Sequence, residues 1–207
     1  MTKQNRESPT AGVLPADAIA PAMMAAYDHC LLFVAPVNQV TCLNFTNYIV
    51  ELSRGGAKSL LLAMNSPGGD VDAGFTICNL IQSARFDIDV HNIGNVDSVA
   101  NIIFLGGKRR FSVSTGVFLF HGVGFDGNGA ERLEERNLKI KLGIVEAQHK
   151  RMASVLESRT SIAASEATKL FERDERHDAN WAKDKGIIHE IVDFKIPAKA
   201  DLKYLMT

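Results

Sequence analysis

The chain has 207 residues, of which 46% are hydrophobic, and its formal net charge is -1. This length suits one domain with a possible extension, and the apolar fraction is enough for a sizeable core. A charge near zero argues against attraction to nucleic acid or to a membrane surface. No apolar run approaches the roughly 20 residues that span a bilayer, and residues 1–26 lack the apolar stretch of a signal peptide. We therefore expect a soluble, cytoplasmic protein.

The cysteines and the short basic run argue against two further classes of site. Cys30, Cys42 and Cys78 are widely spaced, and no CxxC or Cys/His ligand spacing accompanies them. We therefore expect no metal site, and we interpret the three as buried, reduced thiols. The trio Lys108-Arg109-Arg110 is interpreted as a solvated turn, because an isolated group of charges usually faces water.

Strands and helices alternate along the first 121 residues. An N-terminal arm, polar and then rich in Ala and Pro, occupies residues 1–30. After it, hydrophobic runs and turn residues predict, in chain order, a strand over 30–37, a helix over 43–52, a strand over 59–64, a helix over 73–84, a strand over 87–93, a helix over 98–105, and strands over 110–113 and 117–121. This alternation predicts an α/β fold with a parallel sheet.

The next part of the chain has a different pattern. Apolar residues recur at helical intervals over about 130–157, which predicts an amphipathic helix about 40 Å long. Such a helix either packs on the core or projects as an oligomerisation element, and we favour projection because its length exceeds what a small domain accommodates. A short helix over 163–171 and a strand after Gly186 follow. The tail over 195–207 has no informative pattern.

The turn from Asn65 to Gly74 is the most informative segment. Pro67, Gly68 and Gly69 follow a buried strand, and the glycines let another molecule lie against the main chain. Their N–H groups lie at the C-terminal edge of the sheet, where α/β proteins bind ligands. A phosphate site would need the Lys-Ser/Thr pair of a P-loop or a GxGxxG run, and neither is present. An oxyanion site and a purely structural turn both remain open.

Three side chains are candidates for chemistry, and each also has a structural interpretation. Ser98 follows a strand and a glycine turn, so it either exposes its hydroxyl at the sheet edge or caps the next helix. His121 ends an apolar strand and is either a functional group or a satisfied core residue. Asp174 ends the short helix and is a solvated charge unless it meets His121.

Several motifs occur together in one order. They are Asn65-Ser66-Pro67-Gly68-Gly69, Gly94-x-x-x-Ser98, Lys108-Arg109-Arg110-Phe111, His121, Glu172-Arg173-Asp174 and Gly186-Ile187-Ile188. Their order and spacing resemble the Clp protease proteolytic subunit, a family of self-compartmentalising serine peptidases. The resemblance covers residues 31–194, which we take as a catalytic domain between the N-terminal arm and the C-terminal tail.

The resemblance implies a fold, an assembly and a substrate. The fold would consist of repeated β-β-α units with a projecting handle helix at about 130–157. Copies of the chain would form a homo-oligomeric ring whose chamber takes peptides or unfolded proteins, without a cofactor. Pro67 and Gly68 would belong to the turn that supports the site.

The resemblance also implies a role for each site residue. Ser98 would be the nucleophile, His121 the general base, and Asp174 the carboxylate that orients the histidine. The backbone N–H groups of Gly69 and Val99 would form the oxyanion hole. The implied activity is that of a serine-type endopeptidase.

The chain also departs from the family pattern. Asp97 stands where the family has a small residue, Val123 where it often has proline, and Glu175 where it often has arginine. A non-catalytic ring subunit is therefore an alternative, and a crotonase-like acyl-CoA enzyme is a more distant one. Residues 1–30 lack a recognisable axial loop, so an AAA+ unfoldase ATPase partner is not expected.

Overall fold

The computed structural model describes residues 27–124 and 134–205. Its strands are β1 (His29–Val34), β2 (Ser59–Ser66), β3 (Asp87–Asp97), β4 (Arg110–Ser112), β5 (Val117–Phe120), β6 (Glu175–Asp178), β7 (Glu190–Ile191) and β8 (Asp201–Tyr204). Its helices are α2 (Gln39–Gly55), α3 (Val71–Ser83), α4 (Ala100–Leu105), α5 (Glu135–Arg159), α6 (Ala164–Arg173) and α7 (Ala179–Asp184). Most of the predicted N-terminal arm, residues 1–26, lies outside this range.

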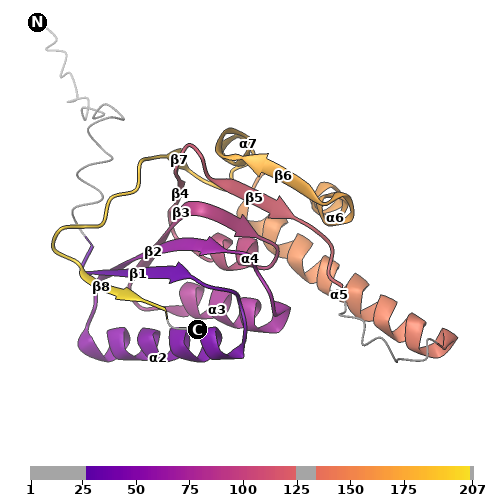
Figure 1. Cartoon of the computed structure of the whole chain (residues 1–207), viewed down its shortest axis with the longest axis horizontal. Helices are drawn as coiled ribbons and strands as arrows, with labels where there is room; N and C mark the ends of the chain where they lie inside the picture. Colours follow the sequence, from indigo (N-terminus) through magenta and orange to yellow (C-terminus); the bar gives the residue numbers. More distant parts are fainter. Residues whose placement is uncertain (1–26, 125–133, 206–207) are drawn as a thin grey trace, which may run out of the picture.

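One sheet organises the described part of the chain. Its main path runs β6-β5-β3-β2-β1-β8, and β4 and β7 extend it from β3. Every pairing is parallel except the antiparallel pair β5–β6. This confirms the α/β class, and Figure 1 shows α2 and α3 side by side along the β1–β3 part of the sheet.

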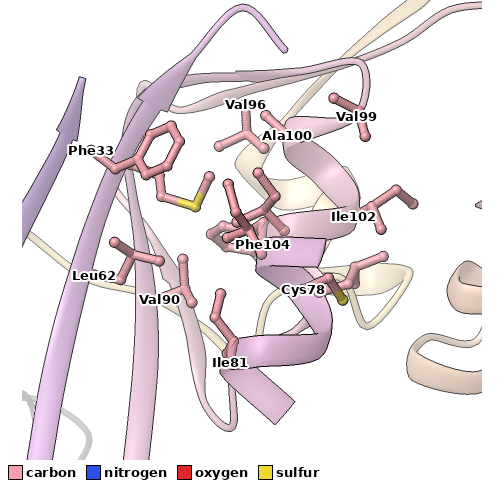
Figure 2. Close-up of a cluster of buried hydrophobic side chains, with 14 of the residues drawn as sticks. Phe33, Leu62, Cys78, Ile81, Val90, Val96, Val99, Ala100, Ile102 and Phe104 are labelled. Atoms are coloured by element: carbon pink, nitrogen blue, oxygen red, sulfur yellow. The ribbon is translucent and has the colours of Figure 1, made fainter. Parts of the chain in front are cut away.

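The core lies between this sheet and its helices. Residues 60–64 of β2 are completely buried, as expected for a central strand covered on both faces. Figure 2 shows Phe33 and Leu62 from the sheet facing a cluster that includes Ile81 of α3 and Phe104 of α4. At about 25 cal/mol per Å² of buried apolar surface, this packing is the main term that stabilises the fold.

Strand β3 is longer than the sequence pattern predicts. It continues to Asp97 instead of ending at Ile93, because a second partner takes over its pairing. Its first half pairs with β4 and its last residues, Asn95 to Asp97, pair with β5. At the change of partner, the Asn65 side chain accepts a hydrogen bond from the Asn95 N–H at 2.9 Å. The extension brings the end of β3 directly to Ser98.

The C-terminal segment contributes to the sheet, although no sequence pattern indicated it. Residues 201–204 form β8, which pairs in parallel with β1 and places a strand at that edge. Leu205 follows it and is buried. Long-range pairing, not local propensity, fixes this element.

Helix α5 projects beyond the sheet, as Figure 1 shows. Buried residues appear only in its last two turns, at Met152, Ala153 and Leu156. Its first half exposes large apolar side chains, namely Leu138, Ile140, Leu142 and Ile144. Residues 130–133 of the predicted handle lie outside the described range. No helix in residues 27–124 and 134–205 is long and apolar enough to cross a membrane.

The interpretation of the basic trio at 108–110 as a solvated turn holds for Lys108 and Arg109 but is wrong for Arg110. Lys108 and Arg109 are exposed, and Arg109 pairs with Asp89, which is completely buried. Arg110 is 5% exposed and donates to the backbone carbonyls of four residues, Gly107, Arg159, Gly186 and Ile187. Burial next to another guanidinium lowers the pKa of Arg110 to about 10. Sequence context did not reveal this because all four acceptors come from folded loops and helix ends.

Candidate active site

Ser98 lies in the connection between β3 and α4, with φ of 57°. This left-handed conformation is unusual for a residue other than glycine and costs on the order of 1 kcal/mol. Two contacts hold it: the Ser98 N–H donates to the Leu119 carbonyl at 2.8 Å, and the Ser98 carbonyl accepts from the Asn101 backbone at 3.1 Å. Helix α4 has no side-chain cap, so neither Asp97 nor Ser98 acts as the N-cap that the sequence allowed.

The residues that flank Ser98 anchor it in the core. Val96, Val99 and Ala100 are completely buried, while Ser98 itself is partly exposed. Figure 2 shows all three buried side chains in the cluster between the sheet and α3. The serine therefore stands at the surface end of a packed segment that has little freedom to move.

The glycine turn packs directly against this serine. Gly68 has φ of 81°, and a Cβ added there would lie 2.6 Å from both the Asp97 carbonyl oxygen and the Ser98 Cβ. The same position is 3.2 Å from the Val99 nitrogen. Only a residue without a side chain permits this approach. The turn is thus fixed to the segment that carries Ser98.

Gly69 follows Gly68, and Val99 follows Ser98, so each contributes a backbone N–H next to this contact. Gly69 forms an isolated parallel bridge with Val37, and its φ is 143°. Among the described residues, neither the Gly69 N–H nor the Val99 N–H has an acceptor. Free, fixed donors beside a serine are the requirement for an oxyanion hole. The oxyanion hole formed by these two groups stays a prediction.

His121 directly follows β5, the strand that receives the Ser98 N–H. Its Nδ1 lies 2.8 Å from the Gly122 carbonyl oxygen. A carbonyl oxygen only accepts, so Nδ1 carries a proton, and in the neutral ring Nε2 keeps its lone pair. This is the tautomer that a general base needs at Nε2.

Asp174, the third residue of the predicted triad, has no hydrogen bond to His121 or Ser98 in the described structure. It ends α6 in a left-handed conformation, with φ of 52°, and its side chain is exposed. The antiparallel register pairs Phe120 with Glu175, so His121 and Asp174 are the next positions along the two strands. Within the described residues, the His121 ring has no hydrogen bond to Asp174 or to Ser98 Oγ. The predicted triad therefore stays a prediction.

Asp97 is a buried carboxylate beside the serine. It is 9% exposed, and its Oδ1 has no hydrogen-bond partner among the described residues. The register aligns it with Leu119 and, on the next strand, with Arg176. Burial raises the pKa of Asp97, and the charge of Arg176 partly opposes that effect. The sequence flagged this residue as a departure but gave no indication of its burial.

A residue that the sequence reasoning missed is His149, on α5. Its Nε2 accepts a hydrogen bond from the Val123 N–H at 2.9 Å, and its ring stacks on Phe171 at 5.7 Å. Its spacing from Met152, Ala153 and Leu156 puts it on the buried face of the helix, which is the signal that could have singled it out. Burial lowers the pKa of His149, and Glu172 opposes this shift.

The described residues contain little else that would hold a ligand. No group of three or more His, Cys, Asp or Glu side chains that could bind a metal ion occurs in residues 27–124 and 134–205. A shallow pocket of about 400 Å³ lies between the first turns of α2 and α3, lined in part by Asp70 and Asp72. Asp70 caps α3 by accepting from the Ala73 N–H at 2.8 Å. In the described structure all three cysteines are free, and Cys42 is only half-buried.

Comparison with known proteins identifies the family. Residues 20–195 match the Clp protease family. The chain is 30% identical over 142 residues to ATP-dependent Clp protease proteolytic subunit 2 of Borreliella burgdorferi, covering 67% of this chain and 69% of that protein. It is 25% identical over 161 residues to ATP-dependent Clp protease proteolytic subunit 1 of Streptomyces coelicolor, covering 76% of this chain and 71% of that protein.

A solved structure supports the same fold. A point mutant of ClpP1 from Listeria monocytogenes superposes with a TM-score of 0.72 at 21% identity, covering 86% of this chain and 97% of that one. The match over most of the chain, together with Ser98 between β3 and α4 and the glycine turn beside it, leads to one conclusion: the chain belongs to the Clp protease family of peptidases.

Proposed function

We propose that this protein is a serine endopeptidase that hydrolyses peptide bonds within an oligomeric chamber. The observation that carries the proposal is the contact of Gly68 with Ser98 and Val99, which holds two free N–H groups beside a partly exposed serine. A tight turn of purely structural purpose would not require this proximity to a serine in a strained conformation.

The chemistry follows from the residue types. Ser98 Oγ attacks the substrate carbonyl carbon while His121 Nε2 takes its proton. The Gly69 and Val99 N–H groups donate to the oxygen that becomes negatively charged. Losing one such donor typically raises the barrier by about 2.7–4 kcal/mol. The imidazolium of His121 then protonates the leaving amine, and water repeats the cycle on the acyl-enzyme.

Asp174 is proposed to join this set when substrate binds. Catalytic hydrogen bonds are often long or absent in a free enzyme and shorten in the complex. The β5–β6 register supports this role, since it sets Asp174 opposite His121. Its carboxylate would stabilise the imidazolium and share the Nδ1 proton with the Gly122 carbonyl.

The exposed apolar half of α5 supports a ring assembly. Leu138, Ile140, Leu142 and Ile144 are each at least 44% exposed, which is unfavourable for a helix that stays in water. A second copy of the chain would cover them. This assembly agrees with the relatives' names, which call them subunits of a Clp protease. The substrates proposed for the resulting chamber are peptides and unfolded segments of proteins.

An activity-based probe tests the proposal. A fluorophosphonate should label wild-type protein at Ser98, and the assembled protein should cleave an unstructured fluorogenic peptide. Ser98→Ala should abolish both signals without changing the thermal unfolding temperature. If the assembled wild-type protein neither takes up the label nor cleaves any member of a peptide library, it is not a serine peptidase.

A non-catalytic ring subunit is the second candidate. The exposed position of Asp174 and the absence of a described contact between it and His121 favour this candidate. It predicts normal assembly with no labelling of Ser98 under any condition. Labelling that depends on His121 excludes it.

A further inference from the structure

The peptide group between Gly122 and Val123 is hydrogen-bonded on both edges by histidines. Its carbonyl oxygen lies 2.8 Å from His121 Nδ1, and its N–H donates to His149 Nε2 at 2.9 Å. No cis peptide bond occurs in the described chain, so the C=O and N–H of this group point in opposite directions. The two rings therefore lie on opposite edges of one rigid, planar unit.

The chemistry of the acceptors fixes the proton on each ring. His121 must donate through Nδ1, because the carbonyl has no proton to give. His149 must be neutral with its proton on Nδ1, because Nε2 accepts from the Val123 N–H. One consistent chain of donors therefore runs from His121 through the peptide to His149.

His149 is itself held firmly from α6. Its ring stacks on Phe171 with an interplanar angle of 20°. A Cβ added to Gly122 would lie 3.1 Å from the Phe171 carbonyl oxygen and 3.5 Å from His149 Nε2, so this glycine allows the close approach. Phe171 is three residues before Asp174, and His149 therefore contacts both segments that carry candidate catalytic groups.

We propose that His149 is a positioning residue for His121, which it orients through the Gly122–Val123 peptide group. The inference rests on the proposed function, in which His121 is the general base. By accepting the N–H, His149 fixes the rotation of the peptide plane and polarises its carbonyl toward His121 Nδ1–H. The handle helix thus controls the tautomer of the base without touching the substrate.

Protonation of His149 breaks this link. An imidazolium has no lone pair at Nε2, so it cannot accept the Val123 N–H. Two titratable groups face His149. Glu172 lies on α6, and His121, which follows β5, lies on the other side of the peptide group. Burial of His149 lowers its pKa more than Glu172 raises it. The pKa of His149 therefore lies below the ordinary value, and the link is intact at neutral pH and is lost as the pH falls through that lowered pKa.

Two substitutions separate the hydrogen bond from packing. His149→Gln keeps an acceptor at the Nε2 position but does not titrate, whereas His149→Phe keeps an aromatic ring on Phe171 and removes the acceptor. We expect His149→Phe to lower kcat/KM for peptide cleavage about tenfold and His149→Gln to stay within about threefold of wild type at pH 7.5. At acidic pH, the decrease in kcat/KM of wild type should depend on the binding of one more proton than the decrease in kcat/KM of His149→Gln.

A matched control is available in the same chain. His189 also accepts a backbone N–H through a ring nitrogen, from Arg110 to Nδ1 at 3.0 Å, and burial lowers its pKa too. His189→Asn retains an acceptor at that position and should leave the acid limb of the pH profile unchanged. Equal activity of His149→Phe and wild type, or an identical proton count in His149→Gln and wild type, overturns the proposal.

A measurement that needs no catalysis distinguishes failure of this inference from failure of the proposed function. Nitrogen-15 spectra of labelled histidines should show His149 protonated at Nδ1 only, and His121 protonated at Nδ1. In His149→Phe, the His121 signal should shift toward the Nε2-protonated tautomer. An unchanged His121 tautomer overturns the inference even if Ser98 labels normally, whereas a shifted tautomer in a protein that cleaves nothing supports it and rejects the peptidase assignment alone.

Discussion

Val37 and Gly69 form a single parallel bridge that orients the glycine turn. The Val37 N–H donates to the Gly68 carbonyl and the Val37 carbonyl accepts from the Asp70 N–H, both at 2.8 Å. A parallel bridge of this kind uses the backbone groups of the residues before and after Gly69, not those of Gly69 itself. Gly69 therefore directs its own N–H away from Val37, and the bridge leaves that donor free for a ligand.

Replacement of Gly68 should disrupt the site. Gly68→Ala combines a positive φ with a Cβ 2.6 Å from Ser98 Cβ and the Asp97 carbonyl oxygen. We expect a loss of about 1–3 kcal/mol in the free energy of unfolding and a large decrease in the rate of fluorophosphonate labelling. Chemical denaturation and labelling kinetics measure the two effects.

Gly55 provides the control for this change. It lies in α2, and nothing lies within 4 Å of a Cβ added there. Gly55→Ala should leave labelling unchanged and raise stability by no more than about 1 kcal/mol, because alanine favours the helix. If Gly68→Ala behaves like Gly55→Ala, the turn does not pack on the serine as described.

Asp97→Asn should stabilise the protein at neutral pH. The pKa of Asp97 is raised by burial, so the folded state holds its proton more tightly than the unfolded state does. Its contribution to stability is thus full below about pH 3.9 and declines as pH rises through the raised value. We expect a gain on the order of 1 kcal/mol for Asp97→Asn at pH 7 and a smaller one below pH 4, read from thermal unfolding.

The exposed Asp174 supplies the comparison, since Asp174→Asn should change the unfolding temperature little at either pH. The same variant should lower kcat/KM if Asp174 orients His121. A gain from Asp97→Asn that does not depend on pH would show that the charge of Asp97 is not the cause.

Arg110 should be among the most sensitive positions in the fold. Arg110→Met keeps the bulk of the side chain but leaves carbonyls such as those of Ile187 and Gly186 without their donors. We expect a loss of about 2–4 kcal/mol in urea unfolding. Lys108→Met removes only an exposed ion pair with Asp87 and should cost less than about 1 kcal/mol.

A charge on the projecting half of α5 should weaken assembly. Leu142 is 57% exposed, so Leu142→Glu costs little in packing within one protomer. At an interface between copies it would bury an unpaired carboxylate, and we expect a shift to smaller species in analytical ultracentrifugation. Lys150→Glu makes a larger change of charge at an exposed polar position and should leave the species unchanged; equal behaviour of both variants would remove α5 from the interface.

Local chemistry allowed much of this protein to be predicted from its sequence. Hydrophobic periodicity located the central strands and the long helix, because burial on a sheet or along a helical stripe imposes a fixed spacing. The residues Pro67, Gly68 and Gly69 predicted a turn against which another group could lie. The order of Ser98, His121 and Asp174 then indicated a family, which the comparisons confirm.

Only the tertiary structure decided which groups meet. It buried Arg110 and Asp97, which look like surface charges in the sequence, because their surroundings come from distant segments. It paired residues 201–204 with β1 and gave His121 a carbonyl partner in a peptide group whose N–H donates to His149 of α5. Sequence spacing determines periodicity within an element, but the partners of a buried polar group depend on how the elements pack, and that information is absent from any local pattern.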